Sequence, residues 1–229
     1  MIYLKQFASA IVAAAGSGLR MNSEKSKQLI EICGKPVIAH SLLALENSPH
    51  IGEIIIVTRE SDILIMSDIS KEFGITKVTD IIKGGDTRTE SVKNGILHAR
   101  YDFVAIHDGA RPCADPDDIE KVIETAFSSD AAALGCRVCD TLKRADEDLV
   151  ITETVDRENL WQIQTPQVFR KDLILKAYES ADTEGATDDC MLVENTGGKV
   201  TVVEGKKSNI KITFPGDIPL AEAILKGNK

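Results

Sequence analysis

The sequence has few aromatic residues, no excess of basic charge and no long apolar run. Aromatic side chains make up 4% of its 229 residues, and 36 acidic residues outnumber 27 lysines and arginines, for a formal net charge of -9. A protein that binds nucleic acid without sequence preference normally carries a basic face, so that class is disfavoured. A membrane span needs about 20 consecutive apolar residues, which the sequence does not contain. With no signal peptide at its start, we expect a cytoplasmic protein without nucleic-acid or membrane partners.

The five cysteines show no pattern of paired spacing: Cys33, Cys113, Cys136, Cys139 and Cys190. An odd, irregular set does not suggest a disulfide framework, so we expect reduced thiols. The C-x-x-C at residues 136–139 lacks a second pair to complete a metal site. It also follows a predicted strand, whereas a redox motif would open a helix. We therefore interpret these two cysteines as incidental.

Short apolar runs alternate with segments of helical periodicity. Strands are predicted at residues 10–14, 53–58, 78–82, 103–106 and 131–138. Helices are predicted after Pro36, over residues 63–73, from a Thr87-x-x-Glu90 capping box to about residue 99, and from an Asp115-Pro116 cap to near residue 127. This alternation predicts an α/β fold with a mostly parallel sheet and helices on both faces. The length suits a single domain over residues 1–229.

The alternation stops between residues 139 and 160. This stretch is polar, with short Thr and Val alternations around residues 145–148, and we expect a protruding β-hairpin arm there. Two strands alone are marginal in water, so a second copy of the chain is the simplest cover, which predicts a homodimer. Further on, helices are predicted at residues 171–179, after Thr187 and from Asp217, with a strand at 199–204.

A Gly-Ser-Gly turn at residues 16–18 follows the first strand, and Arg20, Lys25 and Lys27 come soon after. Such a turn lets backbone N–H groups approach a phosphate. A dinucleotide fingerprint is disfavoured because methionine replaces its third glycine and no acidic residue ends the second strand; no P-loop signature is present. A plain turn remains open. The cations favour a polyphosphate, although Lys25 fits a solvated surface equally well.

Two more stretches follow predicted strands and should lie at the same edge of the sheet. They are "GGDTRTESVKNG" at residues 84–95 and "HDGARP" at residues 107–112. The glycines of the first allow close backbone approach. Asp108 in the second is either a cap of a helix or turn, or a ligand of Mg²⁺, which is held by one or two carboxylates together with substrate phosphates.

Seven stretches, in order, resemble the 2-C-methyl-D-erythritol 4-phosphate cytidylyltransferase family: "AIVAAAGSGLRM", "KQLIEICGKPVIAHSL", "GGDTRTESVKNG", "HDGARP", "WQIQTPQVF", "TDDCMLVE" and "NIKITFPGDIPLAE". The resemblance covers nearly the whole chain. Departures are few, such as Gly109 where many members have Ala. The resemblance implies a Rossmann-like nucleotidyltransferase fold, a homodimer joined by the arm, and transfer of CMP from CTP to 2-C-methyl-D-erythritol 4-phosphate with Mg²⁺, releasing pyrophosphate.

The resemblance also implies roles for particular residues. Those expected to face the nucleotide are the backbone of Ala14, Ala15 and Gly16, the cytosine-reading Gly85, Asp86 and Ser91, and, at the ribose or metal, Asp108 and Gly109. Those expected to be catalytic are Arg20, Lys27 and Lys211. Those expected to bind the sugar phosphate are Arg111, Thr165 and Thr187, with Thr141 and Arg157 reaching from the arm into the neighbouring subunit's site.

Taken one at a time, several of these residues have ordinary structural explanations. Lys211 could be a strand lysine that snorkels, and Thr165-Pro166 could be a turn. Thr187 could be a helix N-cap, and Arg157 could pair with an acidic neighbour. Trp161 is expected in the core or at an interface.

The expected chemistry needs no general base. A phosphate monoester has a second pKa of about 6 and is already dianionic at neutral pH. We therefore expect His107 to be structural. Three other functions stay open: an alditol-phosphate cytidylyltransferase such as one for ribitol 5-phosphate, an NAD(P)-dependent reductase, and a nucleotide sensor without catalysis.

Overall fold

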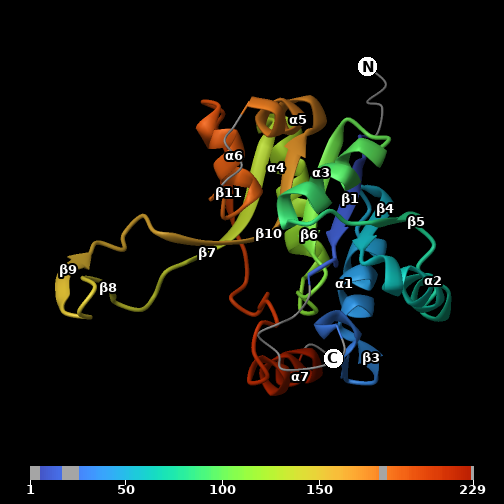
Figure 1. The fold of residues 1–229 in the computed structure, drawn as a ribbon, viewed down its shortest axis with the longest axis horizontal. Coiled ribbons are helices and arrows are strands. Elements are labelled where there is room, and N and C mark those ends of the chain that lie inside the picture. Colours follow the sequence, from blue (N-terminus) through green and yellow to red (C-terminus); the bar gives the residue numbers. More distant parts are fainter. Residues whose placement is uncertain (1–5, 17–25, 181–184, 228–229) are drawn as a thin grey trace.

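The computed structural model describes residues 6–16, 26–180 and 185–227. Its centre is a mixed seven-stranded sheet in the order β11-β7-β10-β6-β1-β4-β5 (Figure 1). The strands are β1 (Ala8–Ala13), β4 (Ile51–Thr58), β5 (Val78–Lys83), β6 (Phe103–Asp108), β7 (Ala131–Arg137), β10 (Trp161–Arg170) and β11 (Thr201–Glu204). The predicted α/β fold is confirmed.

Strand β1 lies inside the sheet and pairs in parallel with β4 on one side and β6 on the other. Strands β4 and β5 are also parallel, as are β7 and β11. Both faces of β1 are covered, which explains its nearly continuous run of small and β-branched apolar residues. Parallel pairing also brings the ends of β1 and β6 together, so Ala13 lies opposite Asp108.

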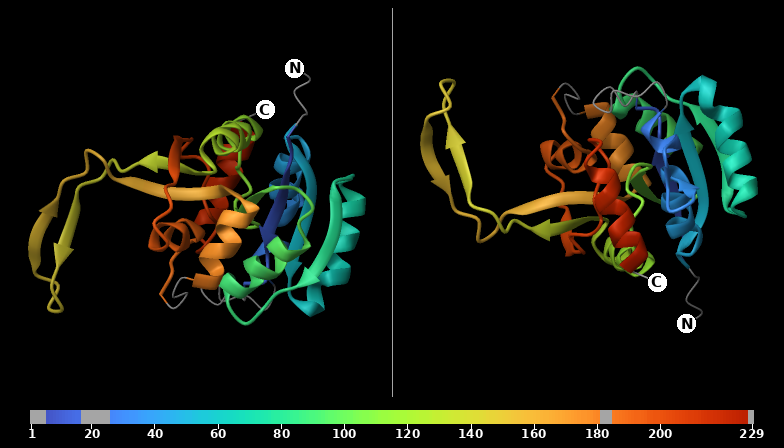
Figure 2. Two further views of the ribbon diagram at one scale, coloured as in Figure 1. Left: turned by 90° about the horizontal axis from the view of Figure 1, so that it is seen from above. Right: turned by 90° about the horizontal axis from the view of Figure 1, so that it is seen from below.

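Helices cover both faces of the sheet, as the alternation predicts (Figure 2). They are α1 (Val37–Glu46), α2 (Ile63–Glu72), α3 (Arg88–His98), α4 (Pro116–Ser129), α5 (Lys171–Ser180), α6 (Asp189–Asn195) and α7 (Asp217–Gly227). One buried apolar cluster joins α1, α2 and α4 to one face, and a second joins α3, α5 and α6 to the other. No helix of the described residues has both the length and the apolar character to cross a bilayer.

A smaller layer lies beside α1 and α7. It contains the 3₁₀ turn η2 (Lys27–Leu29) and the hairpin of β2 (Glu31–Ile32) and β3 (Lys35–Pro36). Another 3₁₀ turn, η3 (Glu60–Asp62), precedes α2. Ile32, Val37, Cys113, Ile212 and Ala221 form a third buried cluster that holds α7 against this layer. This packing brings the segment before α7 close to η2, although they are far apart in sequence.

Strand β10 is the main element that the sequence pattern does not predict. It runs antiparallel between β6 and β7. The glutamines and Pro166 in β10 do not suggest a strand. Proline donates no hydrogen bond to a neighbouring strand and normally argues against an interior strand. The structure accommodates Pro166 where the pairing with β7 shifts register, between Ile163 and Gln167.

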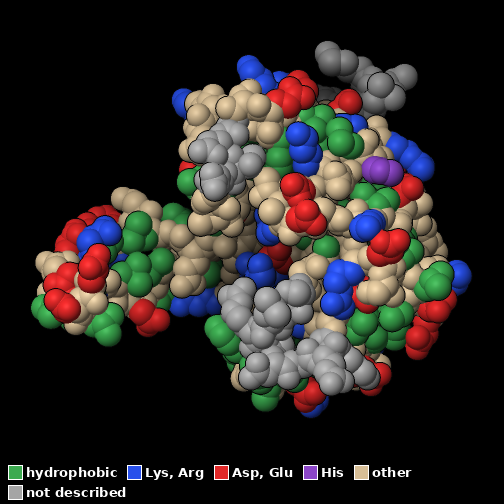
Figure 3. All heavy atoms as spheres, in the orientation of Figure 1, with side chains coloured by type: hydrophobic (Ala, Val, Ile, Leu, Met, Phe, Trp, Pro, Cys, Tyr) green, Lys and Arg blue, Asp and Glu red, His purple; other side chains and the backbone are tan. Residues whose placement is uncertain are grey.

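The predicted arm is present as a two-stranded sheet of its own, formed by β8 (Leu142–Ala145) and β9 (Ile151–Val155). It projects away from the rest of the chain (Figures 1 and 2). At its turn Leu149, Val150 and Ile151 are 85%, 59% and 62% exposed. Figure 3 shows hydrophobic and acidic side chains together on this isolated element.

Candidate active site

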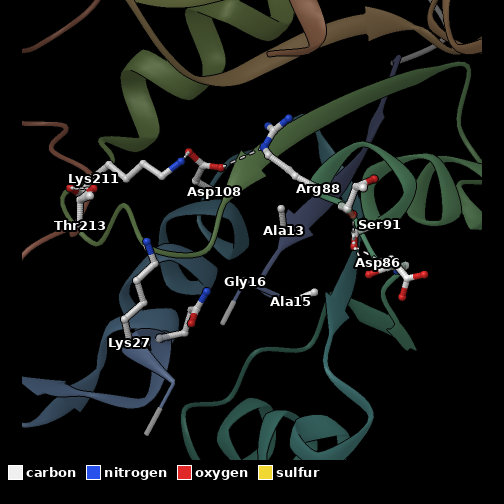
Figure 4. A pocket seen from close by; sticks show the side chains of 14 residues that line it. Ala13, Ala15, Gly16, Lys27, Asp86, Arg88, Ser91, Asp108, Lys211 and Thr213 are labelled. Atoms are coloured by element: carbon white, nitrogen blue, oxygen red, sulfur yellow. Dashed lines mark hydrogen bonds and ion pairs between the residues drawn. The ribbon is translucent and has the colours of Figure 1, made fainter. Parts of the chain in front are cut away.

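A cavity of about 460 Å³ lies at the edge of the sheet where β1 and β6 end (Figure 4). Its walls come from the loops after β1 and β5, the start of α3, the end of β6, the turn η2 and the segment before α7. The lining residues are Ala13, Ala15, Gly16, Lys27, Gln28, Gly85, Asp86, Thr87, Arg88, Ser91, Asp108, Ala110, Lys211 and Thr213. The structure therefore brings together most residues that the sequence stretches at this edge suggest.

The loop after β5 needs glycine for close packing. A Cβ on Gly84 would lie 2.6 Å from Ser91 Oγ and 2.7 Å from Ala15 Cβ. Ser91 Oγ accepts a hydrogen bond from the Gly85 N–H at 3.1 Å and donates to Thr87 O at 2.8 Å. The predicted capping box is also present: Glu90 N donates to Thr87 Oγ1 at 3.1 Å, and Glu90 Oε2 accepts from Thr87 N at 3.2 Å. These bonds tie the loop to the first turn of α3, and Gly84 packs it against Ala15.

Of the three backbone positions expected at the nucleotide, Ala14 is the one that does not line the cavity, although Ala13 before it does. The N–H of Ala14 donates to Val57 O at 2.8 Å, so this amide is used within the sheet. Ala15 and Gly16 line the cavity. Arg20, predicted to be catalytic, lies outside the described residues.

Both predicted catalytic lysines reach the cavity, and they come from distant parts of the sequence. Lys27 Nζ donates to Ile212 O at 2.9 Å, which joins η2 to the segment before α7. Lys211 Nζ lies 2.8 Å from Asp108 Oδ2. Figure 4 shows both ammonium groups on the same side of the cavity. The ion pair with Asp108 accounts for Lys211 better than snorkelling does.

Asp108 is the carboxylate at the centre of this arrangement. Its N–H donates to Thr165 Oγ1 at 3.0 Å, which fixes the end of β6 against β10. Burial favours the protonated acid, but the charges of Lys211, Arg88 and Arg111 outweigh it and hold the pKa of Asp108 well below its usual range. Asp108 is therefore ionised at neutral pH.

Arg88 is a cavity residue that the sequence reasoning missed. It is the first residue of α3, where a positive charge is disfavoured by the helix dipole. The structure supplies the compensation: Arg88 Nη1 lies 2.9 Å from Asp189 Oδ2, and its Nε lies 3.7 Å from Asp108 Oδ1. Burial opposes the charge of Arg88, but the two carboxylates outweigh burial and raise the pKa of Arg88 above its ordinary value. The sequence feature that could have identified Arg88 is an arginine at a helix N-terminus beside a glycine loop.

A second hollow of about 380 Å³ adjoins the first at Lys211 and reaches the base of the arm. Arg111 lines it, with Nη1 donating to Asn209 O at 2.7 Å and Nε 3.6 Å from Asp108 Oδ2. Arg137, Lys207 and Lys211 add further positive charge to its walls. The arrangement suits an anion next to the main cavity.

Other predicted residues do not line the main cavity. A Cβ on Gly109 would lie 2.5 Å from Ile38 Cδ1, so this glycine serves close packing on α1. Thr165 is buried beneath Asp108 within β10, so its segment is strand rather than turn. Thr187 is exposed, and the N-cap of α6 is Asp188, whose side chain accepts from Met191 N at 3.0 Å.

The two predicted arm residues also lie outside this cavity. Thr141 is exposed just before β8, and Arg157 follows β9. The Arg157 guanidinium donates to Cys139 O across the base of the arm. Trp161, half-buried at the start of β10, stacks with Arg137, whose guanidinium carbon is 4.5 Å from the ring centroid.

His107 is structural, as the chemistry predicts. It is completely buried, and its Nδ1 lies 3.2 Å from Thr165 Oγ1. Burial lowers its pKa to about 4, so the imidazole is neutral at pH 7. His107 is not among the cavity-lining residues.

A mixed sheet covered by helices on both faces, with a cation-lined cavity at its carboxyl edge, places the chain among α/β proteins of the nucleotidyltransferase fold. The model of the 2-C-methyl-D-erythritol 4-phosphate cytidylyltransferase family matches residues 8–227. Curated relatives of that name come from Caldanaerobacter subterraneus subsp. tengcongensis (46% identity; 95% of this chain, 98% of the relative) and Clostridium acetobutylicum (44%; 96% and 97%). The chain belongs to this family.

Solved structures agree with this assignment. A 4-diphosphocytidyl-2C-methyl-D-erythritol synthase from Anaerococcus prevotii is similar with a TM-score of 0.85 and 36% identity, covering 97% of each chain. A 2-C-methyl-D-erythritol 4-phosphate cytidylyltransferase from Thermus thermophilus is similar with a TM-score of 0.79 and 29% identity, covering 96% of this chain and all of the other.

Proposed function

We propose that this chain transfers CMP from CTP to 2-C-methyl-D-erythritol 4-phosphate, giving 4-(cytidine 5'-diphospho)-2-C-methyl-D-erythritol and pyrophosphate. The observation that carries the proposal is the convergence of Lys27, Arg88 and Lys211 around Asp108 in one cavity. In a chain of net charge -9, such local convergence of cations favours a polyphosphate ligand. Family membership supplies the identity of the nucleotide and the acceptor.

In the proposed reaction, an oxygen of the acceptor phosphate attacks the α-phosphorus of CTP. A new P–O bond forms, the bond to the β-phosphate oxygen breaks, and its electrons leave with pyrophosphate. Both reactants are anions, so positioning and positive charge supply most of the catalysis. We assign charge stabilisation to Lys27, Lys211 and, from the family resemblance, Arg20. The glycine loop with Asp86 and Ser91 would receive the cytosine.

Asp108 is the residue that we propose for Mg²⁺. Its Oδ2 is held by Lys211, whereas its Oδ1 lies 3.7 Å from Arg88 Nε, beyond hydrogen-bond distance. One carboxylate oxygen at the wall of a polyphosphate cavity fits this ion, which takes its remaining ligands from phosphates and water. When bound, Mg²⁺ would neutralise part of the triphosphate charge.

We also propose that the arm joins two copies of the chain. No residue between 140 and 160 lines the described main cavity, and apolar side chains at the arm's turn are exposed. In a homodimer, Thr141 and Arg157 would approach the acceptor phosphate bound to the other subunit, together with that subunit's Arg111. This arrangement would add positive charge beside the second hollow.

The direct test is pyrophosphate release from CTP and Mg²⁺, measured in parallel with 2-C-methyl-D-erythritol 4-phosphate and with ribitol 5-phosphate. The expected result is release with the first acceptor alone. Release with ribitol 5-phosphate alone would keep the CTP site and replace the acceptor. CTP binding without release in either reaction would favour a nucleotide sensor.

A further inference from the structure

Arg88 connects two carboxylates from different parts of the fold. Its Nη1 lies 2.9 Å from Asp189 Oδ2, at the start of α6, and its Nε lies 3.7 Å from Asp108 Oδ1, at the end of β6. The Asp189 side chain is 1% exposed, that of Asp108 9%, and that of Arg88 34%. One guanidinium therefore links a buried carboxylate to the carboxylate at the cavity wall, as Figure 4 shows for the Asp108 side.

Asp189 is a fixed point in this chain of contacts. The Tyr178 hydroxyl on α5 donates to Asp189 Oδ1 at 2.6 Å. The Asp189 N–H donates to Gln167 Oε1 on β10 at 3.2 Å, and Gln167 Nε2 donates to Asp188 Oδ2 at 2.9 Å. Tyr178 on α5 thus holds the Asp189 carboxylate, and Gln167 on β10 holds the backbone of Asp189 at the start of α6. An arginine anchored in this way loses less freedom when it also contacts Asp108.

The other two cations beside Asp108 lie nearest to its other carboxylate oxygen, Oδ2. Lys211 Nζ lies 2.8 Å from Oδ2 and Arg111 Nε lies 3.6 Å from it. For Arg88, by contrast, the nearest oxygen of the Asp108 carboxylate is Oδ1. Without Arg88, the attraction on Asp108 would come from Lys211 and Arg111 alone, and the carboxylate would turn toward them.

We propose that Arg88 is a positioning residue for Asp108, anchored by Asp189, and that it keeps Oδ1 directed into the cavity where CTP and its metal ion bind. The proposal rests on the proposed function, because it assigns Asp108 to the nucleotide. It also gives α6 a part in the site, although no residue of α6 lines the described cavity.

A double-mutant cycle tests whether Arg88 acts through Asp108. The proteins are the parent, Arg88→Gln, Asp108→Asn and the double variant, and the readouts are the Kd of CTP with and without Mg²⁺ by calorimetry and kcat/KM for CTP. We expect Arg88→Gln to weaken Mg²⁺-dependent CTP binding and kcat/KM by about 10-fold or more in the parent, the scale of losing a residue that orients a ligand. In the Asp108→Asn background the same change should cost less than about threefold, because the positioned group is gone.

Two further variants keep the result decisive if Arg88→Gln does not fold. Arg88→Lys retains the charge, but a single ammonium does not span both carboxylates, so it should show the same dependence on Asp108. Asp189→Asn leaves Arg88 in place and removes its anchor. It should therefore also weaken Mg²⁺-dependent CTP binding in the parent, and cost less in the Asp108→Asn background. Arg100→Gln is the matched control: Arg100 also contacts a buried carboxylate, Glu53, at 3.4 Å, and should leave CTP binding unchanged.

Equal losses in both Asp108 backgrounds would overturn the proposal, because Arg88 would then act independently of Asp108. A protein that binds CTP but forms no product from 2-C-methyl-D-erythritol 4-phosphate would contradict the proposed function alone, since the binding cycle would still decide the role of Arg88. A parent protein that does not bind CTP would contradict both.

Discussion

At the scale of single residues, the site depends on a few positively charged side chains that the fold brings into one cavity. Lys27, Arg88 and Lys211 come from three separate segments, and each contributes to the same cavity. Asp108, the carboxylate at the end of β6, stays ionised because the charges of Lys211, Arg88 and Arg111 outweigh the effect of its burial. Replacing one of these charged side chains should therefore alter catalysis without altering the fold.

Replacing Lys27 should affect the chemical step. Because Lys27→Ala removes one preorganised positive charge from the phosphate site, we expect kcat to fall about 100-fold or more. Steady-state pyrophosphate release measures this change. Lys71→Ala, on the exposed surface of α2, is the control with kcat unchanged. A purified, folded Lys27→Ala protein with parental kcat would remove Lys27 from the mechanism.

His107 should make the protein less stable in mild acid. Burial lowers its pKa to about 4, from an ordinary value of about 6.5. Between these values the unfolded chain binds a proton that the folded chain does not, so stability is present above pH 6.5 and is lost as pH falls toward 4. Linkage puts this loss at roughly 2–3 kcal/mol by pH 4.5.

Urea unfolding at pH 7 and pH 4.5 measures that loss. His107→Gln does not titrate, so the difference in free energy of unfolding between parent and variant should narrow as the pH falls. A difference that stays constant between the two pH values would show that His107 is not buried as a neutral imidazole.

At the scale of elements, the loop between β5 and α3 forms part of the cavity wall and is held in place by the cap of α3. Its glycines allow it to pack on Ala15, and the Ser91 hydroxyl ties the Gly85 N–H to the first turn of α3. The same helix begins with Arg88. A small displacement of this loop would therefore move several groups of the site together.

Gly84→Ala should weaken CTP binding more than it slows chemistry. The new Cβ would lie 2.7 Å from Ala15 Cβ, so the loop must shift away from the cavity wall. We expect KM for CTP to rise about 10-fold or more, since small misplacements of binding groups are costly. Gly227→Ala, where a Cβ meets nothing within 4 Å, should leave KM unchanged. A parental KM in Gly84→Ala would mean that the loop does not bind CTP.

At the scale of the whole molecule, the arm is the part that a single copy leaves uncovered. Its two strands form a sheet of their own, and Leu149, Val150 and Ile151 are exposed at and beside its turn. Exposed apolar side chains on an isolated hairpin are typical of an interaction surface. The proposed homodimer follows from this feature.

Light scattering at assay concentration tests the dimer. We expect the parent to be dimeric and the Leu149→Ser/Ile151→Ser variant to shift toward monomer and lose activity, because Thr141 and Arg157 would no longer reach a partner's site. Glu147→Gln, an exposed change in the same turn, should stay dimeric. An active monomeric parent would contradict both the dimer and the action of the arm between subunits.

Local sequence patterns were enough to predict the alternating strands and helices, the hairpin arm, the capping box at Thr87 and the glycine and cation stretches. These features are local, because periodicity, caps and turns depend on residues a few positions apart in the sequence. Because parallel strands align their carboxyl ends, the sequence also indicated the edge of the sheet that carries the site.

The contacts between side chains at that edge depend on the tertiary fold. It inserted β10 between β6 and β7, paired Asp108 with Lys211, and joined Arg88 to Asp189. It also assigned Gly109 to packing and used the Ala14 amide within the sheet. These outcomes depend on contacts between residues far apart in the chain, whose distances and charges are set by packing rather than by any local pattern.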